Sequence, residues 1–450
     1  MYQTRCLKEF AAYVSLNILG MIGLSCYILA DTFFVSKALG TNGLAALNLA
    51  IPVYSFIHGS GLMIGMGGAT KYSILKSQNK QQAADRVFSN AAALAAGFAV
   101  AFVLLGICFS GTIARLLGAN QAVYQMSKTY LQVILLFAPM FLFNNVLLCF
   151  VRNDGAPQRS MAAMIGGSLS NIILDYVFMF PFGMGIFGAV LATGLAPVVS
   201  MMILSSHFIR RKNGFHFVKC RMTVVRSVGI LSSGFPSFVT EVSSGVVMIV
   251  FNMIILGLEG NIGVAAYGVI ANVSLVVLSI YTGIAQGVQP MISRYYGAKR
   301  PDGVKTAFRY AMVTMLGVSG IVYACVFFGV SLIAEIFNSG QDPFFQKIAV
   351  EGLRIYFAAC PFAGLNIILS VYFTSTAYAR PAHIISLLRG FVMILPMVFL
   401  MSELAGITGV WCSFPATEFL VGVTGVFLYA LSKRQRSSAY ENAKYASGKL

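Results

Sequence analysis

The chain has 450 residues, of which 58% are hydrophobic and 10% are charged, whereas about a quarter of a typical soluble protein is charged. A water-soluble fold cannot bury so much apolar sequence, which excludes a large soluble enzyme, a secreted disulfide scaffold and a disordered chain. The 31 Lys and Arg against 14 Asp and Glu give a formal net charge of +17. Because these basic residues lie mainly between long apolar runs, we interpret them as the positive-inside bias of a membrane protein and expect no nucleic-acid partner.

The apolar runs are long enough for membrane-spanning helices, each of which needs about 20 residues. We therefore predict an all-α polytopic membrane protein with twelve spans in two six-helix lobes. The spans are 10–36, 45–71, 87–112, 129–151, 160–181, 186–209, 229–256, 262–290, 308–333, 350–374, 383–402 and 406–431. The predicted organisation is an N-lobe (1–209), a basic cytoplasmic linker (210–228), a C-lobe (229–432) and a basic cytoplasmic tail (433–450).

The distribution of basic residues predicts the orientation of the chain. With the N-terminus in the cytoplasm, 26 Lys and Arg fall on inner segments and 5 on outer ones, and Arg152 and Arg389 are counted among the inner residues. This asymmetry predicts a multi-pass protein of the cell membrane with both termini cytoplasmic. The eight cysteines lie far apart and mostly inside apolar runs, which favours packing residues over disulfides or metal ligands.

The two halves of the sequence repeat. A shift of 220 residues places Gly40-Thr41-Asn42-Gly43 on Gly260-Asn261-Ile262-Gly263, and a shift of 221 places Gly185 on Gly406. Since each half holds an even number of spans, both copies share one orientation in the membrane. Such parallel repeats are typical of many secondary transporters.

Four acids fall inside predicted spans: Asp31, Asp175, Glu241 and Glu418. A charge at mid-membrane costs at least about 2.5–3.5 kcal/mol, so each is a functional candidate. We expect Asp31 and Asp175 to share a layer near the outer ends of spans one and five. Asn171 precedes Asp175 by four residues and so lies on the same helix face, and Thr193 falls at a similar depth. Their oxygens suit a proton or a small hard cation such as sodium, bound at Asp31 and Asp175.

Glu241 and Glu418 each follow a proline within a span. Pro236 removes a backbone donor and opens the seventh span toward a cavity, so we assign both glutamates to a substrate cavity. For all of these polar groups the alternative is a buried hydrogen-bond network that only fixes helix packing.

Several motifs occur together along the whole chain: Asp31-Thr32-Phe33-Phe34-Val35, Arg152-Asn153-Asp154-Gly155-Ala156-Pro157, Asn171-x-x-x-Asp175, Gly263-Val264-Ala265-Ala266-Tyr267-Gly268 and Gln286-Gly287-x-Gln289-Pro290. In combination they resemble the multidrug and toxic compound extrusion (MATE) transporters, in the branch of MepA and DinF. The resemblance implies a V-shaped pair of lobes, alternating access, and export of bulky, often cationic, aromatic compounds in exchange for sodium ions or protons. It also implies that Asp31, Asn171, Asp175 and Thr193 form the N-lobe cation site, joined from span four by Asn145.

The chain departs from a related branch that has a second cation site in the C-lobe. That branch has an acid in span ten, where this chain has Asn366, so the resemblance does not extend to a C-lobe sodium site. Apart from the coupling ion, we expect no cofactor and no ATPase partner, because no Walker-type lysine motif follows the glycine clusters. We expect a monomer in the lipid bilayer.

Two other functions compete with drug export. A flippase for a lipid-linked or polysaccharide precursor would have a wide basic central cavity. A membrane enzyme acting on lipid would need a clustered nucleophile and base or a metal motif such as HExxH, and the sequence has neither.

Overall fold

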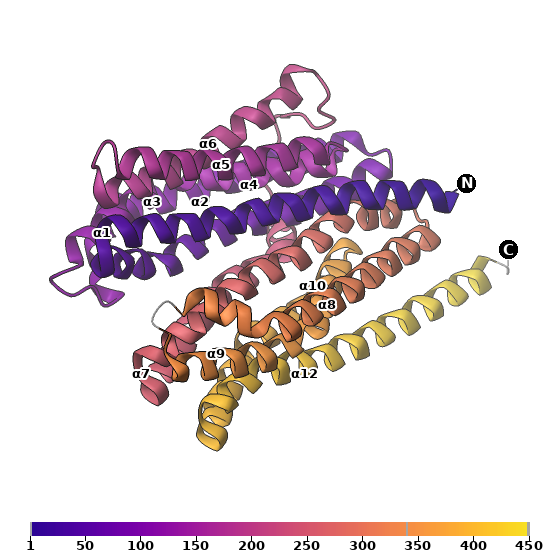
Figure 1. The fold of residues 1–450 in the computed structure, drawn as a ribbon. Helices are drawn as coiled ribbons and strands as arrows, with labels where there is room; N and C mark the ends of the chain where they lie inside the picture. Colours follow the sequence, from indigo (N-terminus) through magenta and orange to yellow (C-terminus); the bar gives the residue numbers. More distant parts are fainter. Residues whose placement is uncertain (1, 339–340, 448–450) are drawn as a thin grey trace.

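The computed structural model describes residues 2–338 and 341–447, with side chains from residue 6 to residue 434 outside that gap. All regular elements of this part are helices, in the order α1 (Tyr2–Ser77), α2 (Gln81–Leu116), α3 (Tyr124–Leu136), α4 (Ala138–Asn153), α5 (Pro157–Met179), α6 (Gly185–Ile209), α7 (Val224–Gly297), α8 (Pro301–Phe337), α9 (Pro343–Tyr356), η1 (Phe357–Ala359), α10 (Cys360–Ser375), α11 (Ala379–Leu387), η2 (Leu388–Val392) and α12 (Ile394–Ser447). They form two bundles that lie close together at the end where the chain begins and diverge at the opposite end (Figure 1).

The helices account for the predicted spans. Among the described residues, eight helical runs are long and apolar enough to cross a membrane, or nine if the bent pair α3 and α4 is one span. Three of these runs contain a kink at a glycine with positive φ, at Gly40, Gly260 and Gly406. Dividing the nine runs at these kinks gives twelve segments, consistent with the prediction, and the all-α membrane fold is confirmed. The predicted tail continues α12 as far as Ser447, and its side chains from residue 435 lie outside the described ones.

The backbone repeats with the same offsets as the sequence. Gly40 has φ 63° and ψ −152°, and Gly260 has φ 62° and ψ −153°. Both have open space where a Cβ would lie, so the backbone conformation itself requires glycine at these turns. Gly185 and Gly406 form a second pair, with φ 58° and 57°. The two lobes are therefore copies of one structural unit.

The interface between the lobes obeys the same symmetry. A Cβ on Gly67 of α1 would lie 2.0 Å from the carbonyl oxygen of Ile230 in α7, and a Cβ on Gly287 of α7 would lie 2.8 Å from Cα of Val14 in α1. Adding 220 to Val14 gives Gly234, which lies against Met63 beside the Gly67 contact. Small residues thus let the two long helices approach closely, as in other membrane interfaces.

The segment between α6 and α7 is fastened to the N-lobe. Gly214 donates its backbone N–H to Oδ2 of Asp154 at 2.6 Å, and Val218 donates its own to Oγ of Ser89 at 2.9 Å. Phe215 is fully buried, with its ring centroid 4.5 Å from that of Phe88. Movement of the C-lobe relative to the N-lobe would therefore begin beyond this anchored stretch.

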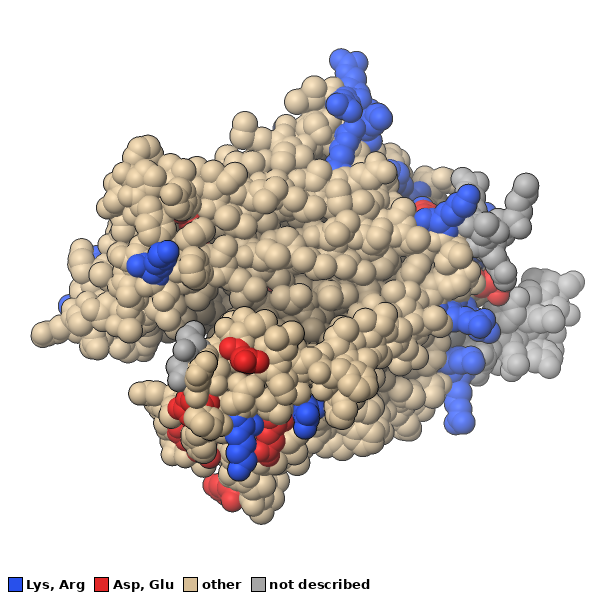
Figure 2. Space-filling model, in the orientation of Figure 1, with Lys and Arg blue, Asp and Glu red and all other residues tan. Residues whose placement is uncertain are grey.

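Charged side chains are concentrated at the two ends of the molecule. In the view of Figure 2, Lys and Arg gather at the end that carries the beginning of the chain, whereas the opposite end of the C-lobe shows both signs. The surface between is almost free of charge in this view, as expected for a lipid-facing belt.

Candidate functional site

The N-lobe contains two buried carboxylates from different helices. Asp31 of α1 is 7% exposed and Asp175 of α5 is fully buried, and the two side chains lie close enough to interact electrostatically. In the described part of the chain, Oδ1 of each carboxylate has no hydrogen-bond partner. Because an unsatisfied buried polar atom is costly, this pair is suited to take up a proton or a cation.

Asn171 and Thr193 complete this site, as the sequence predicts. With the Asn171 amide oriented to satisfy both of its groups, Nδ2 donates to Oδ2 of Asp175 at 3.0 Å and Oδ1 accepts from the backbone N–H of Thr193 at 3.2 Å. The Thr193 hydroxyl donates to the carbonyl of Ala189 within α6 at 3.1 Å. The network joins α5 to α6 and fixes the orientation of Asp175.

Three buried tyrosines adjoin the acids, and sequence reasoning missed them. Tyr130 of α3 makes a side-chain hydrogen bond with Thr193 and is close enough to both carboxylates to interact with their charges. The hydroxyls of Tyr27 and Tyr54 lie 3.0 Å apart. Tyr27 precedes Asp31 by four residues and so shares its helix face, a spacing that could have identified it.

Asn145 of α4 lies elsewhere. It is 5% exposed, and its Nδ2 donates to the carbonyl oxygen of His58 at 3.5 Å. Gly61 and Gly65 pack directly against it. These contacts make Asn145 part of the packing of α4 on α1.

Glu241 of α7 is partly exposed and faces the N-lobe. Its side chain is 35% exposed, and Oε2 lies 3.4 Å from Nδ1 of His58 in α1. The His58 ring stacks on that of Tyr54 with centroids 5.6 Å apart. Tyr54 thereby connects the surroundings of Asp31 with Glu241.

The structure does not place Glu418 on a cavity surface, contrary to our assignment. Glu418 of α12 is 1% exposed, its Oε1 accepts from Nε of Arg389 at 2.5 Å and its Oε2 accepts from Nδ2 of Asn366 at 2.7 Å. Arg389 itself lies in η2, inside a membrane-spanning run, so counting it as a loop residue was wrong. The two errors share one cause, because each charge satisfies the other.

Arg152 also differs from the prediction. It is 1% exposed at the end of α4. Its Nη1 donates to Oδ1 of Asn17 at 2.9 Å and to Oε1 of Gln286 at 2.6 Å. The guanidinium thus lies between the lobes.

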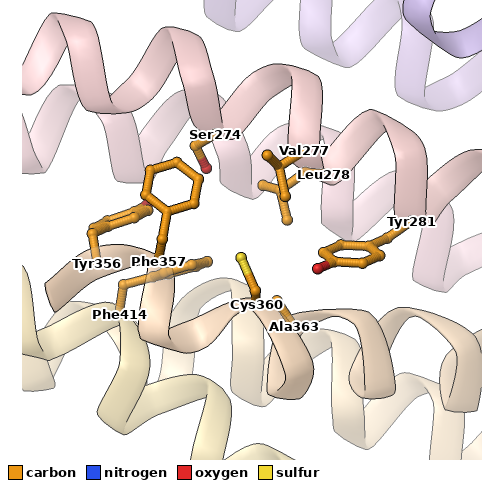
Figure 3. Close-up of a pocket in the computed structure, with 9 residues that line it drawn as sticks. All are labelled: Ser274, Val277, Leu278, Tyr281, Tyr356, Phe357, Cys360, Ala363 and Phe414. Carbon is orange, nitrogen blue, oxygen red and sulfur yellow. The ribbon is translucent and has the colours of Figure 1, made fainter. Parts of the chain in front are cut away.

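A small cavity lies within the C-lobe, between α7, α9, α10 and α12 (Figure 3). It is lined by Ser274, Val277, Leu278, Tyr281, Tyr356, Phe357, Cys360, Ala363 and Phe414. None of these nine residues is an acid or a base, so the cavity is separate from the carboxylates described above. In the described residues, no three His, Cys, Asp or Glu side chains gather in a way that could hold a metal ion. A sodium ion at Asp31 and Asp175 would therefore also need amide, hydroxyl or water oxygens.

Comparison with known proteins gives a consistent result. The MatE family model matches residues 17–177 and 236–400. The multidrug export protein MepA of Staphylococcus saprophyticus is 26% identical over 412 residues, which cover 90% of this chain and 89% of that protein. MepA of Staphylococcus aureus strain MSSA476 is 27% identical over 413 residues, with the same coverage.

Solved structures agree in fold. A crystal structure of MATE in complex with MaL6 superposes with a TM-score of 0.89 at 24% identity, covering 97% of each chain. The outward-facing conformation of a multidrug resistance MATE family transporter gives a TM-score of 0.88 at 24% identity, covering 96% of this chain and 97% of that one.

Proposed function

Because the chain belongs to the MatE family, we propose that it is an antiporter that exports bulky organic cations and is driven by sodium ions or protons entering the cell. Members of this family are membrane transporters and not enzymes. The observation that carries the cation coupling is the buried pair of Asp31 and Asp175, each with an oxygen left without a partner. The multidrug export proteins among its relatives support the substrate class.

Coupling requires that the ion changes the relative stability of the two transport states. Asp31 lies in α1, the helix that also contacts the C-lobe through Ser25, whose Oγ donates to Oγ of Ser279 at 2.7 Å. Neutralising the acid pair would remove the electrostatic repulsion between α1 and α5 and shift α1 against α7. Ion binding in the N-lobe would thereby act on the lobe interface.

The arrangement of the lobes corresponds to an outward-open state. The inter-lobe contacts from Glu9 to Arg294 and from Ser73 to Pro290 lie at the end of the molecule that carries the beginning of the chain. If the termini are cytoplasmic, as the positive-inside bias predicts, the inner side is closed and the lobes diverge toward the outside. In this state the acids would take up an ion and release a drug.

Glu241 supplies the negative charge expected for organic cations. It is partly exposed, and the rings of Phe56 and Phe238 pack beside it with centroids 5.7 Å apart. A carboxylate next to aromatic faces favours cationic aromatic molecules. The alternative substrate, an anionic lipid-linked precursor, would be repelled by this acid.

The decisive test is transport of a fluorescent organic cation in proteoliposomes under separately imposed sodium and proton gradients. Asp31→Asn keeps the size of the side chain and removes its charge, so we expect a folded protein without gradient-driven export. Asp302→Asn, at an exposed acid of α8, is the matched control and should export like the wild type. Wild-type export by a well-folded Asp31→Asn variant would refute the proposal.

A further inference from the structure

The C-lobe holds a buried ion pair on the helices that repeat those of the N-lobe site. Arg389 and Glu418 are joined at 2.5 Å, and Asn366 of α10 donates to the second carboxylate oxygen. The offset of 221 residues between Gly185 and Gly406 maps Glu418 onto Pro197 of α6. It maps Arg389 onto Ser168 of α5, seven residues before Asp175. The pair thus lies on the repeat counterparts of α5 and α6, one to two turns nearer the inner side.

The two sites differ in how their carboxylates are satisfied. In the N-lobe, Asp31 and Asp175 repel each other, and each keeps an oxygen without a partner. In the C-lobe, both oxygens of Glu418 accept hydrogen bonds, one of them from a guanidinium. A guanidinium is always charged in proteins, so the position beside Glu418 already holds a positive charge.

The local backbone fixes Arg389 in this position. Residues Leu388–Val392 form a π-helical turn, a feature often found at functional sites. Within this turn, a Cβ on Gly390 would lie 2.7 Å from Oγ of Ser243 and 3.3 Å from Cγ1 of Val239, both in α7. The close packing of Gly390 on α7 holds the turn in place and so sets the direction of the neighbouring Arg389.

We propose that Arg389 is the built-in cation of the C-lobe, permanently filling the site at Glu418, so that only the N-lobe takes up a coupling ion in each cycle. This inference rests on the proposed function, because it concerns which lobe binds the ion. It predicts that the ion-binding capacity of the protein is limited by Arg389 and that removing this residue opens a second site.

The test counts bound cations on the purified full-length chain, using equilibrium binding of radioactive sodium and the release or uptake of protons. Arg389→Met keeps much of the side-chain volume but leaves Glu418 with only Asn366. We expect the number of cations bound per chain to double relative to the wild type. Sodium or acid pH should also raise the thermal midpoint of this variant more than that of the wild type. An unchanged binding number in folded Arg389→Met protein would overturn the inference.

A second variant decides the question should Arg389→Met not fold. The double variant Arg389→Met with Glu418→Gln removes both charges, and we expect it to bind as many cations as the wild type. A lower number would show that Glu418 itself takes up the coupling ion, which also overturns the inference. Asp31→Asn separates the two proposals: alone it should lose the wild-type ion, and combined with Arg389→Met it should keep the new one. Full ion binding by Asp31→Asn alone would refute the N-lobe proposal but not the test of Arg389.

Discussion

Arg152, at the end of α4 in the N-lobe, donates from Nη1 to Oε1 of Gln286 in α7 of the C-lobe at 2.6 Å. One residue further, Nδ2 of Asn153 donates to Oε1 of Gln289 at 2.9 Å. Hydrogen bonds to charged groups contribute about 1.5–3 kcal/mol each. These bonds hold the lobes together at the end of the molecule that we assign to the cytoplasm, and they must break before that side can open.

Replacing Arg152 with Met should therefore favour opening of the inner side. We expect a cysteine introduced at Ser73, a buried position beside Pro290, to react about tenfold faster with a membrane-impermeant thiol reagent, as a loss of ~1.4 kcal/mol implies. Labelling is measured from the inner face after Cys220 is replaced with Ser. Arg159→Met is the control, since Arg159 contacts only Ser206 and His207 through its Nη1 hydrogen bonds. Equal labelling in both variants would contradict the role of Arg152.

Removing the hydroxyl of Tyr130 should weaken binding of the coupling ion. In Tyr130→Phe, Thr193 loses a side-chain hydrogen bond next to the acid pair, which is worth about 1 kcal/mol, or roughly a fivefold change in affinity. Equilibrium binding of sodium and protons to the purified protein measures the effect. Tyr124→Phe, at the start of the same helix, keeps the ring that lies 5.2 Å from the Arg115 guanidinium and should bind ions like the wild type.

Glu241→Gln should reduce export of monovalent organic cations more than export of neutral compounds. A partly exposed ion pair contributes up to about 1 kcal/mol, so we expect up to roughly a fivefold rise in the substrate concentration for half-maximal export of the cations. Paired assays with cationic and neutral substrates of similar size measure the difference. Glu403→Gln, at an exposed acid, is the control. Equal losses for both substrate classes would assign Glu241 to structure or coupling instead.

Asp154 should stabilise the protein in a pH-dependent manner. Burial alone raises the pKa of this carboxyl, but hydrogen bonds from Gly214 N–H, Lys76, Tyr72 and His207 outweigh it and hold the pKa below its ordinary value. The stabilisation is therefore fully present above the unfolded pKa of about 3.9 and is lost as the pH falls through the lower folded value.

Asp154→Asn tests this dependence. We expect it to destabilise the folded state by about 3 kcal/mol at neutral pH, because it breaks a buried charged network. The difference from the wild type should stay constant down to about pH 5 and shrink only below about pH 4. Thermal unfolding in detergent across this range measures it, with Asp302→Asn as the exposed control. A difference that already shrinks near neutral pH would mean that another group causes it.

The sequence by itself determined the spans, the repeat and the acids worth testing. Each follows from a local property: about 20 apolar residues cross a bilayer, a buried charge is costly wherever it lies along a span, and the turns at Gly40 and Gly260 need a positive φ. Asn171 lies on the same helix face as Asp175 because of their spacing alone. Such properties can be read from neighbouring residues without knowledge of the fold.

Only the tertiary structure decided which atoms satisfy each buried charge. Arg152 and Arg389 read as loop residues until Gln286 and Glu418 came beside them, and Glu418 read as a cavity acid for the same reason. Asn145 has the right residue type and depth, yet its amide is directed to His58. The cost of a buried charge is set by the residue itself, whereas the interaction that offsets it depends on partners brought together from distant segments. A pattern along one segment holds the first quantity and not the second.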